Sequence, residues 1–206
     1  MSCRVLGGLV VAVLAGALTL AGCSSTSPAP VPASPSSPTA APVAAEHNAA
    51  DVTFAQSMIP HHAQAIAMAS QATTRAASAQ VNDLASRIEG AQGPEIEQMN
   101  TMLAAWGAPT VSPSATAMPG IPGMAAGAGM PGMMDDAQMS GLAGTTGPAF
   151  DQAFLQMMIQ HHSGAITMAR TELAQGLNPQ AKALANSIIA DQQREIGEMQ
   201  SLLKQG

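Results

Sequence analysis

An internal repeat with an offset of 100 residues constrains the fold of this chain more than any other feature. Residues 51–69 read DVTFAQSMIPHHAQAIAMA and residues 151–169 read DQAFLQMMIQHHSGAITMA, so each copy holds a His-His pair between methionines. Four of the five histidines in the 206-residue chain lie in these two pairs. The duplication predicts one domain built from two copies of the same supersecondary element.

The apolar positions of the repeat have the period of an amphipathic helix. At about 100° per residue, Phe54, Met58 and the His61-His62 pair fall on one side of the first helix. Both imidazoles are therefore expected to face the core. Pro60 lies within this helix and cannot donate a backbone hydrogen bond, so a kink is expected there.

The repeat continues into a second helix of each half. Apolar positions from Leu84 to Leu103 recur from Leu184 to Leu203 and form one stripe. The stripe also contains four polar side chains, Gln92, Glu95, Gln192 and Glu195. A buried carboxylate needs a partner, so the two glutamates are expected to orient imidazoles from outside a metal site, and Gln92 and Gln192 are further candidates for that role. The alternative for them is a structural ion pair with Arg87 or Arg194.

Capping residues mark where the helices begin. Asn48 and Ser78 precede the two helices of the first half, and Gly147-Pro148 and Asn178-Pro179 precede those of the second. We predict an all-α domain over residues 47–206, with hairpins 48–106 and 148–205. The Met/Gly/Pro-rich linker 107–147 joins them and holds a short helix capped by Asp135. Because one hairpin cannot bury its stripe, the two are expected to form a ferritin-like four-helix bundle.

Composition excludes other classes. Aromatic residues make up 2% of the chain and tyrosine is absent, which does not suit a β-sandwich. The formal charge is −6 and no run of lysine or arginine occurs, so nucleic-acid binding is not expected. The sequence indicates no particular protein partner.

The N-terminus is typical of an exported lipoprotein. A short apolar run after Arg4 ends in Leu20-Ala21-Gly22-Cys23, which resembles a bacterial lipobox. We predict a signal peptide over residues 1–22, an acylated (palmitate-type) Cys23 and a disordered Ser/Pro/Ala-rich tether over 23–46. The domain would then be held at the cell membrane, facing the periplasm or the extracellular side. The alternative is an uncleaved signal anchor.

The doubled pattern Asp-x-x-Phe-x-x-x-Met-Ile-x-His-His-x-x-Ala-Ile-x-Met-Ala resembles the domain-of-unknown-function 305 family. The resemblance covers about residues 47–206, including Trp106-Gly107-Ala108-Pro109 and the stretch 133–139. It implies a ferritin-like helical bundle in exported bacterial proteins and, where a role has been assigned, binding of copper outside the cytoplasm. Pro60 and Pro94 depart from the regular pattern in the first half.

Imidazole and thioether ligands without thiolate select copper(I) or silver(I) over zinc. Two His-His pairs on two hairpins can converge in a bundle core, so a metal site is predicted there. The candidate ligands are His61, His62, His161, His162, Met58, Met68, Met158, Met168, Asp51 and Asp151. The aspartates are equally well explained as helix-start residues. The alternative for the histidines is a structural role in the core, hydrogen-bonded to Gln92, Glu95 and their copies.

The linker carries further methionines among glycine and proline, where no core is expected. These thioethers are predicted to be flexible, exposed candidate ligands: Met118, Met124, Met130, Met133, Met134 and Met139. Low-complexity drift explains them equally well.

No enzymatic function is expected. The chain has no Glu-x-x-His, which a di-iron carboxylate oxidase would need on two helices. Ser163 follows His162, but Ala63 takes its place in the other half, so no hydrolase nucleophile is indicated. The predicted function is copper(I) or silver(I) binding for buffering or sequestration in the cell envelope. A structural or interaction module is the alternative.

Overall fold

The structure is a computed structural model, and it describes residues 42–112 and 130–205. The predicted signal peptide, Cys23, most of the tether, Met118 and Met124 lie outside the described residues.

Helices are the regular secondary structure of the described residues, which also contain one isolated β-bridge between Ala76 and Gly147. The helices are α1 (Ala49–Ala69), α2 (Ala72–Arg75), α3 (Ala79–Ala105), α4 (Asp136–Ala143), α5 (Pro148–Gln175) and α6 (Pro179–Leu203). The all-α prediction is confirmed, and α2 is an additional single turn that the sequence pattern did not indicate.

The capping residues determine where these helices begin. Asn48 and Asp51 form a reciprocal capping box at the start of α1. Asp135 forms a second capping box with Gln138 at the start of α4, and the side chains of Ser78 and Asn178 accept from backbone N–H groups at the starts of α3 and α6. Helix α1 continues through Pro60 without interruption.

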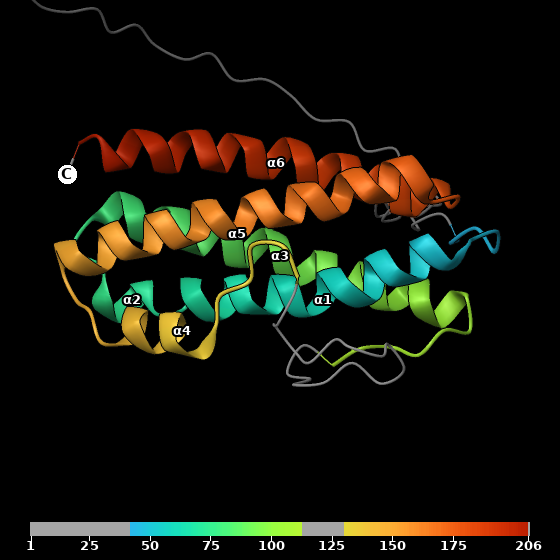
Figure 1. The fold of residues 1–206 in the computed structure, drawn as a ribbon, viewed down its shortest axis with the longest axis horizontal. Coiled ribbons are helices and arrows are strands. Elements are labelled where there is room, and N and C mark those ends of the chain that lie inside the picture. The colour runs from blue at the N-terminus through green and yellow to red at the C-terminus, as the bar shows by residue number, and fades with distance from the viewer. Residues whose placement is uncertain (1–41, 113–129, 206) are drawn as a thin grey trace, which may run out of the picture. The chain divides into compact units, whose positions relative to one another are not determined.

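Four long helices form the bundle that the repeat predicts (Figure 1). Helix α1 packs on α3 within the first hairpin and α5 packs on α6 within the second, while α1–α5 and α3–α6 contacts join the hairpins. Asp51 at the start of α1 bonds to residues just after α5, and Asp151 at the start of α5 bonds to residues just before α3. Helices α1 and α5 therefore run antiparallel, and the two halves are related by an approximate two-fold axis.

These two aspartates make equivalent hydrogen bonds across the axis. The Asp51 carboxylate accepts from the backbone N–H of Leu177 and Asn178, at 3.0 and 2.9 Å. The Asp151 carboxylate accepts from Ala77 and Ser78, at 3.1 and 2.9 Å. Each hairpin therefore holds the turn of the other hairpin.

The core consists of two apolar clusters that obey the same symmetry. One cluster contains Phe54 and Met58 from α1 with Ala165 from α5, and the other contains Phe154 and Met158 from α5 with Ala65 from α1. The predicted inward faces of both halves are thus confirmed. The paired histidines lie near the middle of α1 and α5, between the two clusters.

A segment before α4, the strap Met130–Met134, breaks the symmetry. Gln64 fixes it with two bonds: its amide donates to the Met134 carbonyl at 2.8 Å and accepts from the Met134 N–H at 2.7 Å. Gly132 has φ +78° and lies against Gly164 of α5, where a Cβ on either residue would overlap backbone atoms of the other element. The two glycines let the strap backbone lie directly on α5.

Candidate metal centre

The four repeat histidines form a buried layer at the centre of the bundle. His61, His62, His161 and His162 are all 0% exposed. The rings of His61 and His161 come from antiparallel helices and lie 3.8 Å apart between centroids, tilted by 41°. The ring of His162 lies 6.4 Å from that of His161. The structure thus brings the two pairs together.

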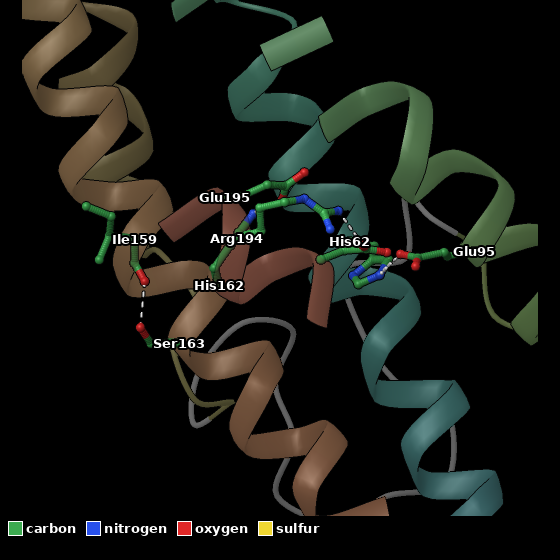
Figure 2. A network of polar contacts seen from close by, with 8 residues as sticks. His62, Glu95, Ile159, His162, Ser163, Arg194 and Glu195 are labelled. Atoms are coloured by element: carbon green, nitrogen blue, oxygen red, sulfur yellow. Dashed lines mark hydrogen bonds and ion pairs between the residues drawn. The ribbon is translucent and has the colours of Figure 1, made fainter. Parts of the chain in front are cut away.

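Glutamates from the second helix of each hairpin fix two of the imidazoles. His62 Nε2 lies 2.8 Å from Glu95 Oε2, and His162 Nε2 lies 2.7 Å from Glu195 Oε2 (Figure 2). Since a carboxylate accepts, each Nε2 is the donor, and in a neutral imidazole the opposite Nδ1 then presents a lone pair. Each glutamate thus hydrogen-bonds one imidazole, and its role beside a metal ion stays a prediction.

The alternative ion pairs for these glutamates do not form. Arg87 pairs with Glu198, and Arg194 pairs with Asp191 on the bundle surface. Figure 2 shows Arg194 near Glu195, but the hydrogen bond of that carboxylate is to His162.

The strap fixes a third imidazole. His61 Nε2 donates to the carbonyl of Pro131 at 3.0 Å, so its Nδ1 is also left with a lone pair. The helical period of the repeat gave no indication of this contact. The glycines that permit it, Gly132 and Gly164, are the only sequence signal that could have indicated a close backbone approach here.

Many polar atoms of this layer are buried without a partner. Among the described residues, Nδ1 of all four histidines, both side-chain polar atoms of Gln92 and Oε1 of Gln192 have no hydrogen-bond partner. The Nε2 atom of His161 also has no hydrogen-bond partner. The predicted hydrogen bonds from Gln92 and Gln192 to the imidazoles are thus not among the contacts of the layer. An unsatisfied buried polar atom costs about 1–3 kcal/mol, so the layer has the chemistry of a binding site rather than of a completed core.

Burial keeps the central imidazoles neutral. It lowers the pKa of His61 to about 3, with the neighbouring His62 acting in the same direction. Burial also lowers the pKa of His161 well below its ordinary value, and nearby His61 adds to this effect. A neutral imidazole is the form that binds a metal ion.

The methionines flank the layer at two distances. Met58 and Met158 are fully buried and lie one helical turn before the histidines of their own helices, one in each apolar cluster. Met68 and Met168 lie about 10 Å along the helix axis from the first histidine of their copy. Met68 is fully buried and Met168 half-buried.

Two roles were predicted for Asp51 and Asp151, metal ligand or helix-start residue, and the structure shows them as helix-start residues. Asp51 and Asp151 begin α1 and α5 and bond to backbone N–H groups, about 15 Å along the axis from the histidines. Although burial alone would raise it, the pKa of Asp51 is lowered by bonds from Asn48 and Asn178. These two residues therefore lie apart from the histidine layer.

The structure corrects the prediction of exposed thioethers in the linker. Met130 and Met134 are 8% and 2% exposed, and Met134 belongs to an apolar cluster against which Met139 also packs. The sequence around them lacks a helical period, so it gave no sign that the strap covers the bundle. Met133 is half-buried. Metal binding by these methionines stays a prediction.

Two further observations bear on the chemistry. Within residues 42–112 and 130–205, no three His, Cys, Asp or Glu side chains are placed to share one metal ion. An ion in the layer would therefore need thioether ligands or a shift of side chains.

The hydroxyl of Ser163 donates to the Ile159 carbonyl of its own helix at 2.7 Å and is exposed (Figure 2).

A buried carboxyl that sequence reasoning missed lies near the start of α1. Glu172 is 1% exposed, and the absence of a side chain on Gly176 makes room for it. Burial and the adjacent Asp51 raise the pKa of Glu172 to about 8. The corresponding residue of the first copy is Ala72, so the repeat gave no signal for an acid here.

The sequence profile of the domain of unknown function DUF305 matches residues 51–203. A DUF305 protein of Streptomyces coelicolor described as secreted has a similar structure, with a TM-score of 0.66 and 33% identity over 76% of this chain and 93% of that chain. No helix in the described residues is long and apolar enough to cross a membrane.

CopM in its Cu(II)-bound form is also similar, with a TM-score of 0.63 and 32% identity over 75% of this chain and 96% of that one. Its Cu(I)-bound form gives 0.60 and 29% over the same shares. A shorter match, 47% identical over 53 residues, is to uncharacterized protein L153 of Acanthamoeba polyphaga mimivirus. It covers 26% of this chain and 35% of that protein, so the chain spans about a third of that relative's length.

Proposed function

The chain belongs to the DUF305 family, and on that premise we propose that it binds copper(I) or silver(I) in the histidine layer. CopM, whose chain is matched over 96% of its length by 75% of this chain, has been solved with Cu(I) and with Ag bound. The observation that carries the proposal is the set of four buried Nδ1 atoms without a hydrogen-bond partner, one on each repeat histidine.

The ligand chemistry supports a soft monovalent ion. Imidazole nitrogen from His61, His62, His161 and His162 is combined with thioether sulfur from Met58 and Met158, one turn away. Such donors favour copper(I), and silver(I) as its mimic, over zinc or calcium. Glu95 and Glu195 hold the His62 and His162 rings, while Met68 and Met168 lie further along the helices. The protein binds the ion as cargo, without catalysis.

Competition with a chromophoric copper(I) chelator tests the site. The double variant His161→Gln/His162→Gln should lose high-affinity binding, while its helical circular dichroism persists. The double variant Met158→Leu/Met168→Leu removes only sulfur at nearly constant volume, so copper affinity should drop while folding is nearly unchanged. His47→Gln, at the histidine outside the repeat, and Met102→Leu, at a buried methionine near the end of α3, are the matched controls.

If all variants hold copper as tightly as the unaltered chain, these residues are not the site. The histidines would then have the structural role, and the linker methionines would be the remaining ligands. If only the histidine variant loses copper affinity, the ligands are imidazole nitrogens and not the thioether sulfurs of Met158 and Met168.

Location in the envelope follows from the N-terminus. The chain is exported and anchored through an acylated Cys23, and the Streptomyces relative described as secreted supports export. There it buffers or sequesters copper outside the cytoplasm. Detergent partitioning of a Cys23→Ala variant tests the anchor: the variant should move to the aqueous phase with an intact mass that lacks the acyl groups. A variant that still partitions wholly with the membrane argues against lipidation.

A further inference from the structure

None of the four imidazoles in the histidine layer is exposed, so an ion from solvent needs a path between the helices. A cleft of about 470 Å³ lies between the first turns of α1 and the last turns of α5, and the strap residues Met130 and Pro131 form another part of its wall. We name it the Glu172 cleft, after the acid that lines it. Two of its lining residues, Thr53 and Thr171, are exposed, so the cleft opens to solvent.

The inner wall of the Glu172 cleft contacts the histidine layer. Pro131 lines the cleft, and its carbonyl accepts from His61 Nε2 at 3.0 Å. Ser57 lines the cleft one helical turn before His61 on α1. It is 5% exposed, and its hydroxyl has no hydrogen-bond partner among the described residues. The cleft and the layer therefore share one residue of the strap.

The walls of the cleft suit a soft cation. The thioethers of Met130 and Met168 line it, and thioether sulfur favours copper(I) and silver(I). Among the described lining residues Glu172 is the one ionisable side chain, so no lysine, arginine or histidine opposes a cation there. Glu172 is 1% exposed and no donor faces either of its carboxyl oxygens, since its neighbour Asp51 is also an acid. A bound cation would give this buried carboxyl a partner.

The equivalent groove in the other half of the repeat is filled. The counterparts of the cleft residues, at the offset of 100, include Met68, Ala72 and Phe154. These three lie in one apolar cluster with Met134 of the strap and Leu142 of α4. Ala72 stands where the Glu172 cleft has its carboxyl, so that side offers an ion neither space nor charge. The asymmetry of the two halves favours the Glu172 cleft as the approach to the layer.

We propose that copper(I) or silver(I) enters the bundle through the Glu172 cleft, where the thioethers of Met130 and Met168 are the first protein ligands of the ion. This inference rests on the proposed function and specifies the route to the same histidine layer. Glu172 supplies the negative charge that balances the ion in the cleft. Displacement of the Pro131 carbonyl from His61 Nε2 then opens the way to the layer.

Plugging the cleft tests the route. Thr53→Trp on α1 and Thr171→Trp on α5 each place a large side chain at the exposed mouth, where folding tolerates it. Stopped-flow transfer of copper(I) from a chromophoric chelator, and release to excess chelator, should both slow by about tenfold or more in either variant. Because a plug hinders entry and exit alike, the equilibrium affinity should change less than the rates.

Thr101→Trp is the matched control for the plug. Thr101 is exposed on α3, and its hydroxyl donates to a carbonyl one turn earlier in its own helix, as that of Thr171 does. This variant should exchange copper as fast as the unaltered chain. Rates in the two cleft variants equal to those of the control, or a loss of affinity without slower exchange, would overturn the route. Circular dichroism verifies that each variant retains its helices.

Silver(I) titration of the His161→Gln/His162→Gln variant tests the thioethers separately from the layer. With methionine methyl groups labelled with carbon-13, the resonances of Met130 and Met168 should shift in NMR spectra, whereas that of Met102, buried in α3, should not. Single Met→Leu variants assign the resonances. Unmoved resonances of Met130 and Met168 would overturn their role as ligands. Because this titration does not depend on the layer, it still decides the role of the cleft if the histidines prove not to bind copper.

Discussion

At the scale of single residues, the Nε2 atoms of His62 and His162 have charged acceptors, although their rings are fully buried. A carboxylate behind an imidazole makes the opposite nitrogen more basic and fixes the ring in one orientation. The layer therefore combines fixed rings with free lone pairs, which is the arrangement that a ligand site needs and a core does not.

Replacement of Glu95 or Glu195 by Gln is expected to weaken copper(I) binding by about 10–100-fold. Glutamine can still accept from Nε2, so the ring orientation is retained, and the loss reflects the missing charge. Chelator competition measures it. Glu198→Gln, which removes only a surface pair with Arg87, should leave the affinity unchanged. Unchanged affinity in all three variants would mean that the glutamates serve folding alone.

Acid should destabilise the metal-free protein through the histidine layer. The pKa of His61 is about 3 in the folded chain, against an ordinary value of 6.5. Between these two pH values the unfolded chain therefore binds a proton at His61 and the folded chain does not. The stabilising contribution is complete above about 6.5 and is lost as the pH falls towards 3. Urea midpoints measured from pH 8 to pH 4 should decline, with a shallower slope for His61→Gln. Equal slopes would place the acid-sensitive groups elsewhere.

Glu172 should act in the opposite direction. Its pKa is raised from 4.5 to about 8, so its neutral form is the folded form. Its contribution is complete below about 4.5 and is lost as the pH rises through 8. Glu172→Gln should therefore raise stability at pH 9 relative to the unaltered chain, by about 1–3 kcal/mol, with little change at pH 4. An equal gain at both pH values would contradict the role of the charge.

At the scale of elements, the strap connects the linker to the histidine layer through one close backbone contact. Gly164→Ala should push the strap off α5, because the added Cβ would overlap the Pro131 carbonyl. Oxidation by peroxide, followed by mass spectrometry, should then modify Met130 and Met134 faster than in the unaltered chain.

Gly197→Ala on α6 is the matched control for this change. Its Cβ would meet nothing within 4 Å, so the variant should be neutral or more stable by up to about 1 kcal/mol. Methionine oxidation equal to the control would show that the strap does not depend on the glycine pair.

At the scale of the whole molecule, each apolar cluster takes residues from both hairpins. An isolated first hairpin, residues 42–112, should therefore lose most of its helical signal or associate with itself, and it should bind little copper as a monomer. Circular dichroism and sedimentation measure this. A monomeric hairpin with full helicity would contradict the shared core.

The repeat made the bundle predictable, because identical apolar stripes in two hairpins can be buried only against each other. The helix starts were predictable from caps such as Asn48 and Ser78, because a cap bonds to backbone N–H groups only two or three residues away. The inward face of His61 followed from helical period alone. The strap over His61 and the acid at Glu172 could not be predicted, because both are departures of one copy from the other and depend on contacts distant in sequence.

The hydrogen bonds of Asp51 and Asp151 have a consequence for the order of folding. Each hairpin is closed by neighbours along the chain, whereas the aspartate bonds join residues 73 to 127 positions apart. Contacts of such long separation form late, after the entropy of closing the intervening loop has been lost. That entropy grows only with the logarithm of loop length, by about 0.6 kcal/mol for each doubling. Insertions between the hairpins should therefore slow the final docking step modestly and leave each hairpin's own formation unaffected.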